Sequence, residues 1–273
     1  SRFMLGNLFD FDPAVDENSY DSMPEVDRFA LHKLQGMIEK TLKASNQYEY
    51  HIIYHALHNY CTLDLSAFYL DILKDRLYTS PPKSNARKSA QTVMYFLLDS
   101  LARIMAPLLP FTAEEIWEYM PAHSEKTSSV HLASLPEVNS QWKDEDLAQK
   151  WETILNIRAE ATKALEEARA AKQIGHPLDA AVTISAKEGL YDLLQPYAED
   201  LRFIFIVSSV SLLKDEKLDS SFESEKLEGL SIKIEAASGK KCERCWIHEL
   251  SVGSDSKHPT ICKRCQKALD NMS

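Results

Sequence analysis

Cysteine spacing is the feature that most constrains what the end of this chain can fold into. Four of the five cysteines form two C-x-x-C pairs, separated by sixteen residues. One C-x-x-C turn places two sulfur atoms on one side of an ion, and a second completes the tetrahedron that Zn²⁺ prefers. The predicted ligands are Cys242, Cys245, Cys262 and Cys265. Four protein ligands leave no position for water, so the spacing predicts one structural zinc ion without a catalytic role.

Disulfides and a redox motif are the alternatives for these thiols. The N-terminal residues lack the charged, apolar and cleavage regions of a secretion signal, which argues against disulfides. A redox motif needs one C-x-x-C pair, and this tail has two. A tail of this size cannot build a sufficient apolar core, so we expect the metal to hold it together. The fifth cysteine, Cys61, lies in an apolar helical stretch, where we expect it to be buried.

The charge of the chain is uneven. The formal net charge is −10, but residues 240–273 carry seven Lys and Arg against four Asp and Glu, which leaves −13 for the rest. Because nucleic-acid phosphates are bound by Lys and Arg, any nucleic-acid contact must come from local patches. The candidates are a tail group of Arg244, Trp246, Lys263 and Arg264, and a helix start with Lys83, Arg87 and Lys88.

Each of these candidates has an alternative role. Trp246 either stacks on an RNA base or packs over the zinc site, and the basic residues either bind phosphate or only solubilise a surface. His51, His55 and His58 share one helix face, but no further ligand is near them in sequence. We expect that face to be exposed rather than to bind metal. No arrangement of residues indicates a catalytic site.

Long amphipathic helices are predicted for residues 22–120, where apolar residues recur at spacings of three and four. Ser22 is expected to cap the first helix together with Glu25, and the second helical region is expected to bend near Thr62–Ser66. This pattern is typical of an up-and-down helical bundle.

The second half of the chain predicts a different architecture. A helix is expected over about residues 144–173, ended by Gly175. The period then changes to two in AAVTISA, VSSVSLL and LSIKIEAA, which predicts strands around a helix interrupted at Pro196. The predicted fold class is mainly α, with a helical bundle, a small α+β junction unit and a C-terminal zinc ribbon.

The expected domains follow these changes in pattern. They are a helical domain at 1–122, a linker at 123–143, a helix with the α+β unit at 144–238, and the zinc ribbon at 239–273. No stretch approaches the roughly 20 apolar residues that span a bilayer. The chain has no initiator Met, so we expect a piece of a longer protein. With seven glycines and no glycine-rich phosphate-binding motif, the sequence argues against a nucleotide-binding core.

Several stretches, in order along nearly the whole chain, resemble the C-terminal region of bacterial-type isoleucyl-tRNA synthetases. They are FMLGNLFDFDP, DRFALHKLQ, YHALHNYCTLDLSAFYLDILKDRLY, LARIMAPLLPFTAEEIWEYMP, IGHPLDAAVTI and KCERCW…CKRC. The stretch around APLLPFTAEEIW is shared with the class I synthetases for Val, Leu and Met. DLSAFYLDILKDRLY and the terminal ribbon are typical of the isoleucine enzyme.

The resemblance implies an anticodon-binding domain, a junction unit, and a ribbon whose four cysteines bind zinc and help to hold tRNA. The whole enzyme joins isoleucine to tRNA(Ile) with ATP, through isoleucyl-adenylate, and we expect it to be a cytoplasmic monomer. Two signatures of its adenylate-forming core, H-I-G-H and K-M-S-K-S, are absent here. The chain is therefore expected to bind tRNA(Ile) alongside the rest of the synthetase, and not to bind ATP or aminoacylate tRNA by itself.

Two other classes remain open. A zinc-ribbon DNA-binding protein would fit the tail, but formamidopyrimidine-type DNA glycosylases need an N-terminal Pro followed by Glu, and this chain begins Ser-Arg. A structural module, whose bundle docks another protein, would show no salt-dependent binding of tRNA.

Overall fold

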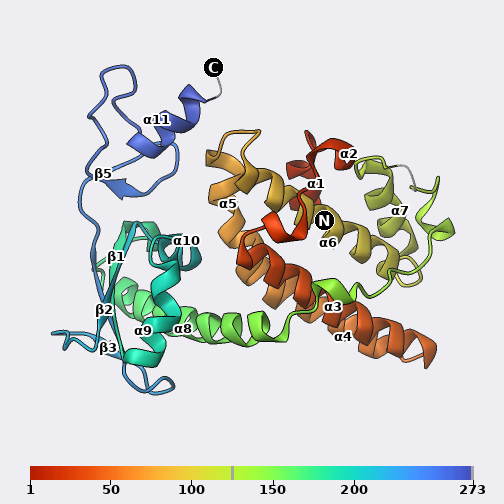
Figure 1. Ribbon diagram of the computed structural model, residues 1–273, viewed down its shortest axis with the longest axis horizontal. Helices are drawn as coiled ribbons and strands as arrows, with labels where there is room; N and C mark the ends of the chain where they lie inside the picture. Colours follow the sequence, from red (N-terminus) through yellow and green to blue (C-terminus); the bar gives the residue numbers. More distant parts are fainter. Residues whose placement is uncertain (124–125, 272–273) are drawn as a thin grey trace. The chain divides into compact units, whose positions relative to one another are not determined.

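The computed structural model describes residues 1–123 and 126–271, which form two compact units (Figure 1). The first unit comprises Ser1–Ala148 and is built from helices. The second comprises Gln149–Ser273 and adds two small sheets. The predicted fold class is thus confirmed: the chain is mainly helical, with a small sheet region and a C-terminal cysteine cluster.

One long helix forms the centre of the first unit. The helical elements of this unit are α1 (Arg2–Asn7), α2 (Pro13–Asp16), η1 (Tyr20–Ser22), α3 (Glu25–Asn46), α4 (Tyr50–Asn59), η2 (Tyr60–Tyr69), α5 (Leu70–Thr79), α6 (Asn85–Met105), α7 (Pro110–Tyr119), η3 (Val130–Leu132) and η4 (Ser140–Trp142). Helix α6 contacts α1, α2, α3, α5 and α7. Its side chains Leu97, Leu98 and Ala102 have no exposed surface, so this helix supplies the middle of the core.

A buried ion pair joins three of these helices. Asp27 on α3 has no exposed surface, and two NH groups of Arg76 on α5 donate to its carboxylate at 3.0 and 2.5 Å. The hydroxyls of Tyr69 and of Ser89 on α6 donate to the same carboxylate at 2.8 and 2.6 Å. Because every partner lies on a different part of the bundle, this carboxylate fixes how α3, α5 and α6 meet.

Two local predictions for this unit are wrong. Ser22 caps no α-helix: it ends η1, and α3 begins after Pro24, whose backbone has the extended ψ of 148° that starts the helix without a side-chain cap. Where a bend was predicted, near Thr62–Ser66, the chain forms the π-helix η2, which leads from α4 into α5. Cys61 is partly exposed, because one side of this π-helix faces solvent.

The second unit contains a mixed sheet and a long helix. Its elements are α8 (Glu145–Ala170, which begins in the first unit), η5 (Pro177–Asp179), β1 (Ala180–Ala186), α9 (Glu188–Leu194), η6 (Gln195–Tyr197), α10 (Leu201–Phe205), β2 (Ser209–Lys214), β3 (Phe222–Glu223), β4 (Leu230–Ala236), β5 (Lys240–Lys241), β6 (His248–Glu249) and α11 (Lys263–Asp270). The sheet order is β2-β1-β4-β3. β1 runs parallel to β2 and antiparallel to β4, so α9, η6 and α10 form the crossover that parallel strands require.

Helix α8 is anchored to this crossover. The Arg158 Nε donates to the carbonyl of Ile204 at 2.8 Å, and the rings of Trp151 and Tyr197 lie 5.7 Å apart, edge to face. The helix ends at Ala170, before the predicted Gly175, because Lys172 already takes the left-handed φ of 59° that turns the chain away.

Candidate metal centre and nucleic-acid interface

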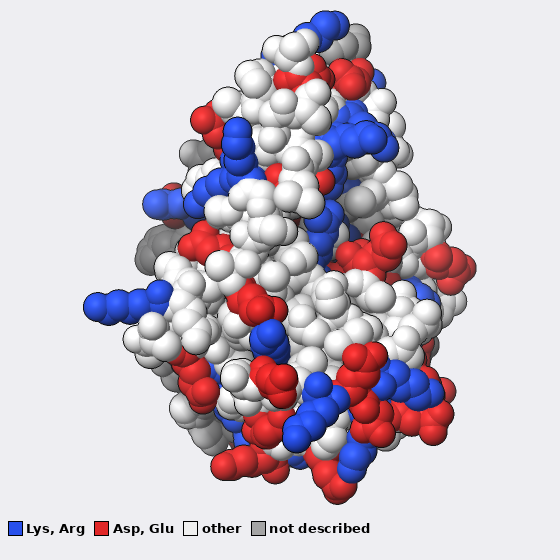
Figure 2. Space-filling view, turned by 90° about the vertical axis from the view of Figure 1, so that its left-hand side faces the viewer, with Lys and Arg blue, Asp and Glu red and all other residues white. Residues whose placement is uncertain are grey.

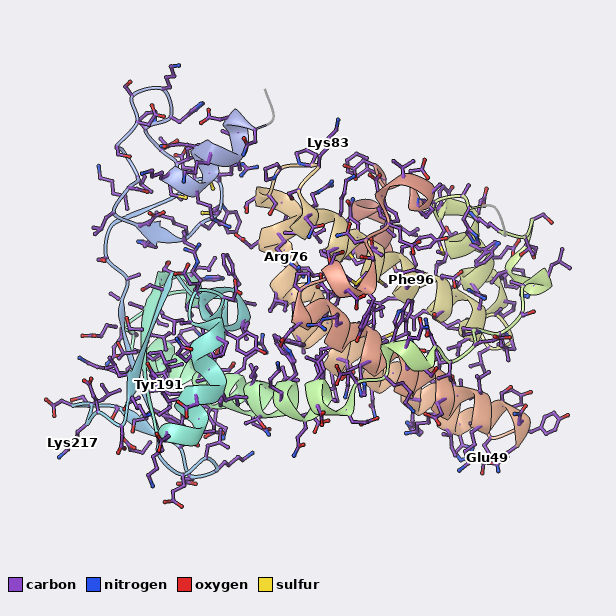
Figure 3. The ribbon with its side chains drawn as sticks, in the orientation of Figure 1. Glu49, Arg76, Lys83, Phe96, Tyr191 and Lys217 are labelled. Carbon is purple, nitrogen blue, oxygen red and sulfur yellow. The ribbon has the colours of Figure 1, made fainter. Side chains whose placement is uncertain are left out.

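The four predicted zinc ligands come together in the second unit. The sulfur atoms of Cys242, Cys245, Cys262 and Cys265 all lie within 4.8 Å of one another, and Figure 3 shows sulfurs gathered beside α11. The Cys245 and Cys262 sulfurs are 3.7 Å apart. A tetrahedron with Zn–S bonds of about 2.3 Å has edges of about 3.8 Å, so the spacing fits zinc. Within residues 1–123 and 126–271 this is the one group of three or more potential ligands so placed.

Two tight turns present these sulfurs. In the first, the Trp246 amide donates to the carbonyl of Cys242 at 2.8 Å, and Trp246 takes a left-handed φ of 67°. That conformation costs an L-residue about 1–2 kcal/mol, so the turn needs a partner that stabilises it. The second turn begins α11, where the Cys262 amide donates to the Cys242 sulfur at 3.3 Å.

The thiols influence one another electrostatically. Hydrogen bonds from Cys262 and Cys265, in that order, lower the pKa of Cys245 to about 3. Hydrogen bonds with Cys245 and Cys262, together with burial, raise the pKa of Cys265, because they favour its protonated form. A dication bound by the four sulfurs would favour the thiolate form instead.

Apolar packing around the thiols is small. The buried cluster consists of Cys242, Val252, Ile261, Cys262 and Cys265. Two of these five residues are aliphatic, Leu269 packs against them, and Ile247 and Ala268 are also buried, so the apolar core of the ribbon is small. The residues present therefore suit a structural metal site.

The ribbon is also attached to the α+β part of its own unit. The His248 amide donates to the Ser208 hydroxyl at 2.7 Å, and the His248 ring lies 3.4 Å from the Asp179 carboxylate. Gly239 opens the ribbon with a φ of 91°, and a Cβ there would lie 2.4 Å from the backbone of Glu249. Glycine thus permits the close approach of the two short strands.

The tail residues predicted to contact RNA differ in exposure. Trp246 is 59% exposed, and the Lys241 Nζ lies 5.8 Å from its ring centroid. Lys263 is exposed, whereas Arg244 and Arg264 are partly buried. Figure 2 shows Lys and Arg gathering in the upper part of the view, with Asp and Glu more frequent below. An exposed ring beside cations is suited to a stacked base and its phosphate.

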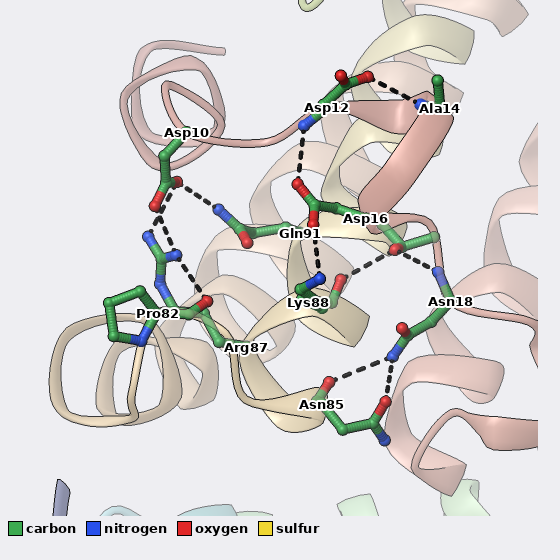
Figure 4. A network of polar contacts seen from close by, with 11 residues as sticks. Asp10, Asp12, Ala14, Asp16, Asn18, Pro82, Asn85, Arg87, Lys88 and Gln91 are labelled. Atoms are coloured by element: carbon green, nitrogen blue, oxygen red, sulfur yellow. Dashed lines mark hydrogen bonds and ion pairs between the residues drawn. The ribbon is translucent and has the colours of Figure 1, made fainter. Parts of the chain in front are cut away.

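The predicted basic patch at the start of α6 does not exist as a free surface. Arg87 is only 7% exposed and forms two hydrogen bonds to the Asp10 carboxylate, at 2.8 and 3.1 Å. The Lys88 Nζ lies 2.6 Å from a carboxylate oxygen of Asp16 (Figure 4). Both cations hold the N-terminal segment on α6. Lys83 is exposed and projects away from the helices (Figure 3).

The acidic partners of these cations were missed in the sequence. Asp10 and Asp16 lie near the N-terminus, far in sequence from Arg87 and Lys88, and no local pattern in the sequence pairs them. The histidine face, in contrast, is exposed as predicted: His51, His55 and His58 are all exposed.

Two family models match the chain. The anticodon-binding domain of tRNA ligase matches residues 27–184, which is more than half of the chain. A zinc finger found in FPG and IleRS matches residues 239–268, which include all four clustered cysteines. The chain therefore belongs to the family of anticodon-binding domains of tRNA ligases, and a zinc finger follows this domain.

The curated relatives narrow the class to one kind of ligase. The isoleucine–tRNA ligase of Geobacter sulfurreducens is 52% identical over 268 residues, covering 98% of this chain and 29% of that protein. The isoleucine–tRNA ligases of Desulforamulus reducens and Moorella thermoacetica are 48% and 44% identical, with 28% and 29% of their lengths covered. The chain thus spans less than a third of the relatives it matches, and the predicted resemblance is confirmed. None of the described helices is long and apolar enough to cross a membrane.

Proposed function

We propose that this chain is the C-terminal, tRNA-binding region of an isoleucine–tRNA ligase and takes part in recognising the anticodon of tRNA(Ile). The observation that carries this proposal is the anticodon-binding family match over residues 27–184, joined to 52% identity across 98% of the chain. In the whole enzyme, which would work in the cytoplasm as a monomer, another region would use ATP to activate isoleucine.

Four domains would divide this work. They are a helical anticodon-binding domain at 1–122, a linker at 123–143, a helix with the α+β junction unit at 144–238, and the zinc ribbon at 239–273. The ribbon would hold one structural Zn²⁺ through Cys242, Cys245, Cys262 and Cys265, as their sulfur spacing supports. The ion would supply four bonds to sulfur and would leave no site for a reacting water.

Two exposed cations, one partly buried cation and one exposed ring would contact the tRNA. Lys83, Arg244 and Lys263 would bind phosphates, and Trp246 would stack on an unpaired base. Arg87 and Lys88 already bind carboxylates, so we assign them to the fold. Signatures of the adenylate-forming core are absent from the sequence, so this chain would bind tRNA without charging it.

Filter binding tests the proposed function. The chain is titrated with tRNA(Ile), with the same tRNA carrying altered anticodon bases, and with duplex DNA of equal length. We expect the unaltered tRNA to bind most tightly, and its log K to fall linearly with the logarithm of salt concentration. Tighter binding of the duplex would instead favour a DNA-binding protein, and no binding at all would favour a structural module. Aminoacylation by the chain alone would contradict the proposed division of labour.

A further inference from the structure

Arg264 lies between the predicted metal centre and the α+β part of the same unit. It stands between Cys262 and Cys265, in the first turn of α11. Its Cζ lies 5.4 Å from the ring centroid of Phe203 on α10. Arg264 is also among the groups that lower the pKa of Cys245, after Cys262 and Cys265, which places its side chain beside that sulfur. One guanidinium group therefore contacts a predicted zinc ligand and a helix outside the ribbon.

Phe203 is suited to receive this cation. The Cζ of Arg202 lies 4.5 Å from the same ring centroid, so two guanidinium groups contact one aromatic ring. Planar guanidinium groups stack on aromatic rings more readily than the compact ammonium of lysine. The contact thus depends on the shape of the Arg264 side chain as well as on its charge.

The metal centre also gains from a nearby cation. Four thiolates around one Zn²⁺ carry a net charge of −2, and hydrogen-bond donors outside the ligand set orient the ligands and tune the metal. Lys263 carries the same charge one residue earlier, but its side chain is exposed, and its backbone amide donates to Ser251 at 3.0 Å. Position, rather than charge alone, distinguishes the two residues.

The second attachment of the ribbon does not involve a thiol. It joins the His248 amide to Ser208 and the His248 ring to Asp179. That attachment holds the β5–β6 end of the ribbon. The contact of α11 with α10 is therefore the place where occupancy of the metal site can affect how the ribbon lies on the α+β part.

We propose that Arg264 is a positioning residue that couples zinc binding to the docking of the ribbon on α10. Its guanidinium stabilises the loaded tetrathiolate through Cys245 and fixes α11 against Phe203. This inference rests on the proposed zinc site. It reassigns Arg264 from a phosphate contact to the joint between the ribbon and the junction unit, while Trp246 and Lys263 keep the proposed RNA-facing role.

Zinc affinity and hydrogen exchange test the proposal in the full 273-residue chain. Zinc affinity is measured by competition with a chromogenic chelator, and exchange is followed in α10. We expect Arg264→Gln to weaken zinc binding about tenfold or more, the usual effect of removing a partner that orients a metal ligand, and to speed exchange in α10. Lys263→Gln, the control that removes the same charge, should match the unaltered chain in both measurements.

Two further variants separate charge from shape. Phe203→Leu removes the docking ring but keeps the guanidinium beside Cys245. It should speed exchange in α10 and, because coupling is reciprocal, weaken zinc binding, but less than Arg264→Gln does. Arg264→Lys should retain part of the zinc affinity and still exchange quickly in α10. If the chain holds one zinc and Arg264→Gln and Lys263→Gln bind it equally well, this inference is overturned while the proposed zinc site stands. A chain that binds no zinc would overturn both the metal site and this inference.

Discussion

The helical bundle buries a continuous apolar core, whereas the ribbon buries little beyond its cysteines. In the bundle, Leu97 and Leu98 of α6 are fully buried, and the buried Asp27 has four hydrogen bonds from three side chains. In the ribbon, the buried thiols are joined by a few aliphatic side chains: Val252 and Ile261 pack with them, and Ile247 and Ala268 are buried as well. The comparison teaches that one chain uses two sources of stability: packed side chains in the bundle, and predicted metal–sulfur bonds in the ribbon.

Removing the metal should have the largest effect, and only on the ribbon. Structural zinc in small fingers contributes an apparent binding free energy of about 10–16 kcal/mol, far more than the ribbon's core can supply. We expect chelation, or the Cys242→Ser change, to abolish hydrogen-exchange protection in α11 while α6 stays protected. Elemental analysis should give one zinc per chain before chelation.

Cys61→Ser is the matched control, since Cys61 lies in the bundle and is not one of the four clustered cysteines. This variant should retain its zinc and its ribbon protection. A metal-free ribbon that stays protected, or a bundle that unfolds on chelation, would contradict the claim that the metal stabilises the ribbon and not the bundle.

Breaking the buried ion pair should be the most costly single change within the bundle. Asp27→Ala leaves the largely buried Arg76 guanidinium without its carboxylate, which is expected to cost about 3–5 kcal/mol of unfolding free energy. Denaturant unfolding measures this decrease. Asp71→Ala removes a carboxylate of a surface pair with Lys74 and should cost less than about 1 kcal/mol. Similar decreases for the two variants would contradict the role of the buried pair.

A smaller effect on stability is expected from the ion pair between Asp10 and Arg87, which holds the N-terminal segment on α6, as the pH falls. Burial alone would raise the pKa of Asp10, but hydrogen bonds from Arg87 and Gln91 outweigh it, so the pKa is lowered overall. A carboxyl group whose pKa is lower when folded adds stability above its unfolded pKa of about 3.9, and that stability disappears as the pH falls through the folded pKa. We therefore expect the bundle to lose stability below about pH 4.

Asp10→Asn sharpens this test. The variant should be less stable than the unaltered bundle at about pH 6 and should lose less stability between about pH 6 and about pH 3, because its amide does not titrate. Exchange of α6 amides reports both quantities. A pH dependence that is the same in the variant and the unaltered chain would show that Asp10 does not contribute.

Local chemistry explains which features the sequence could predict. The spacing of the cysteines, and the alternation in AAVTISA that became β1, each reflect rules that act over a few residues. The partners of Arg87 could not be predicted, since Asp10 lies 77 residues away and only the fold brings the two together. Likewise, Arg264 on α11 meets Phe203 on α10 only in the folded unit, and no local pattern specifies this contact. The π-helix η2 has no comparable sequence signal, because its apolar spacing also fits an α-helix.

The most direct test of the central claim, that a metal-held ribbon and a self-supporting bundle bind one tRNA together, is the affinity for tRNA(Ile) before and after zinc removal. We predict weaker binding after chelation, with the slope of log K against log salt shallower by about 0.7–0.9 for each phosphate that the protein no longer neutralises. Far-UV circular dichroism should show that the bundle helices persist. Unchanged affinity and slope after complete removal of zinc would contradict the claim.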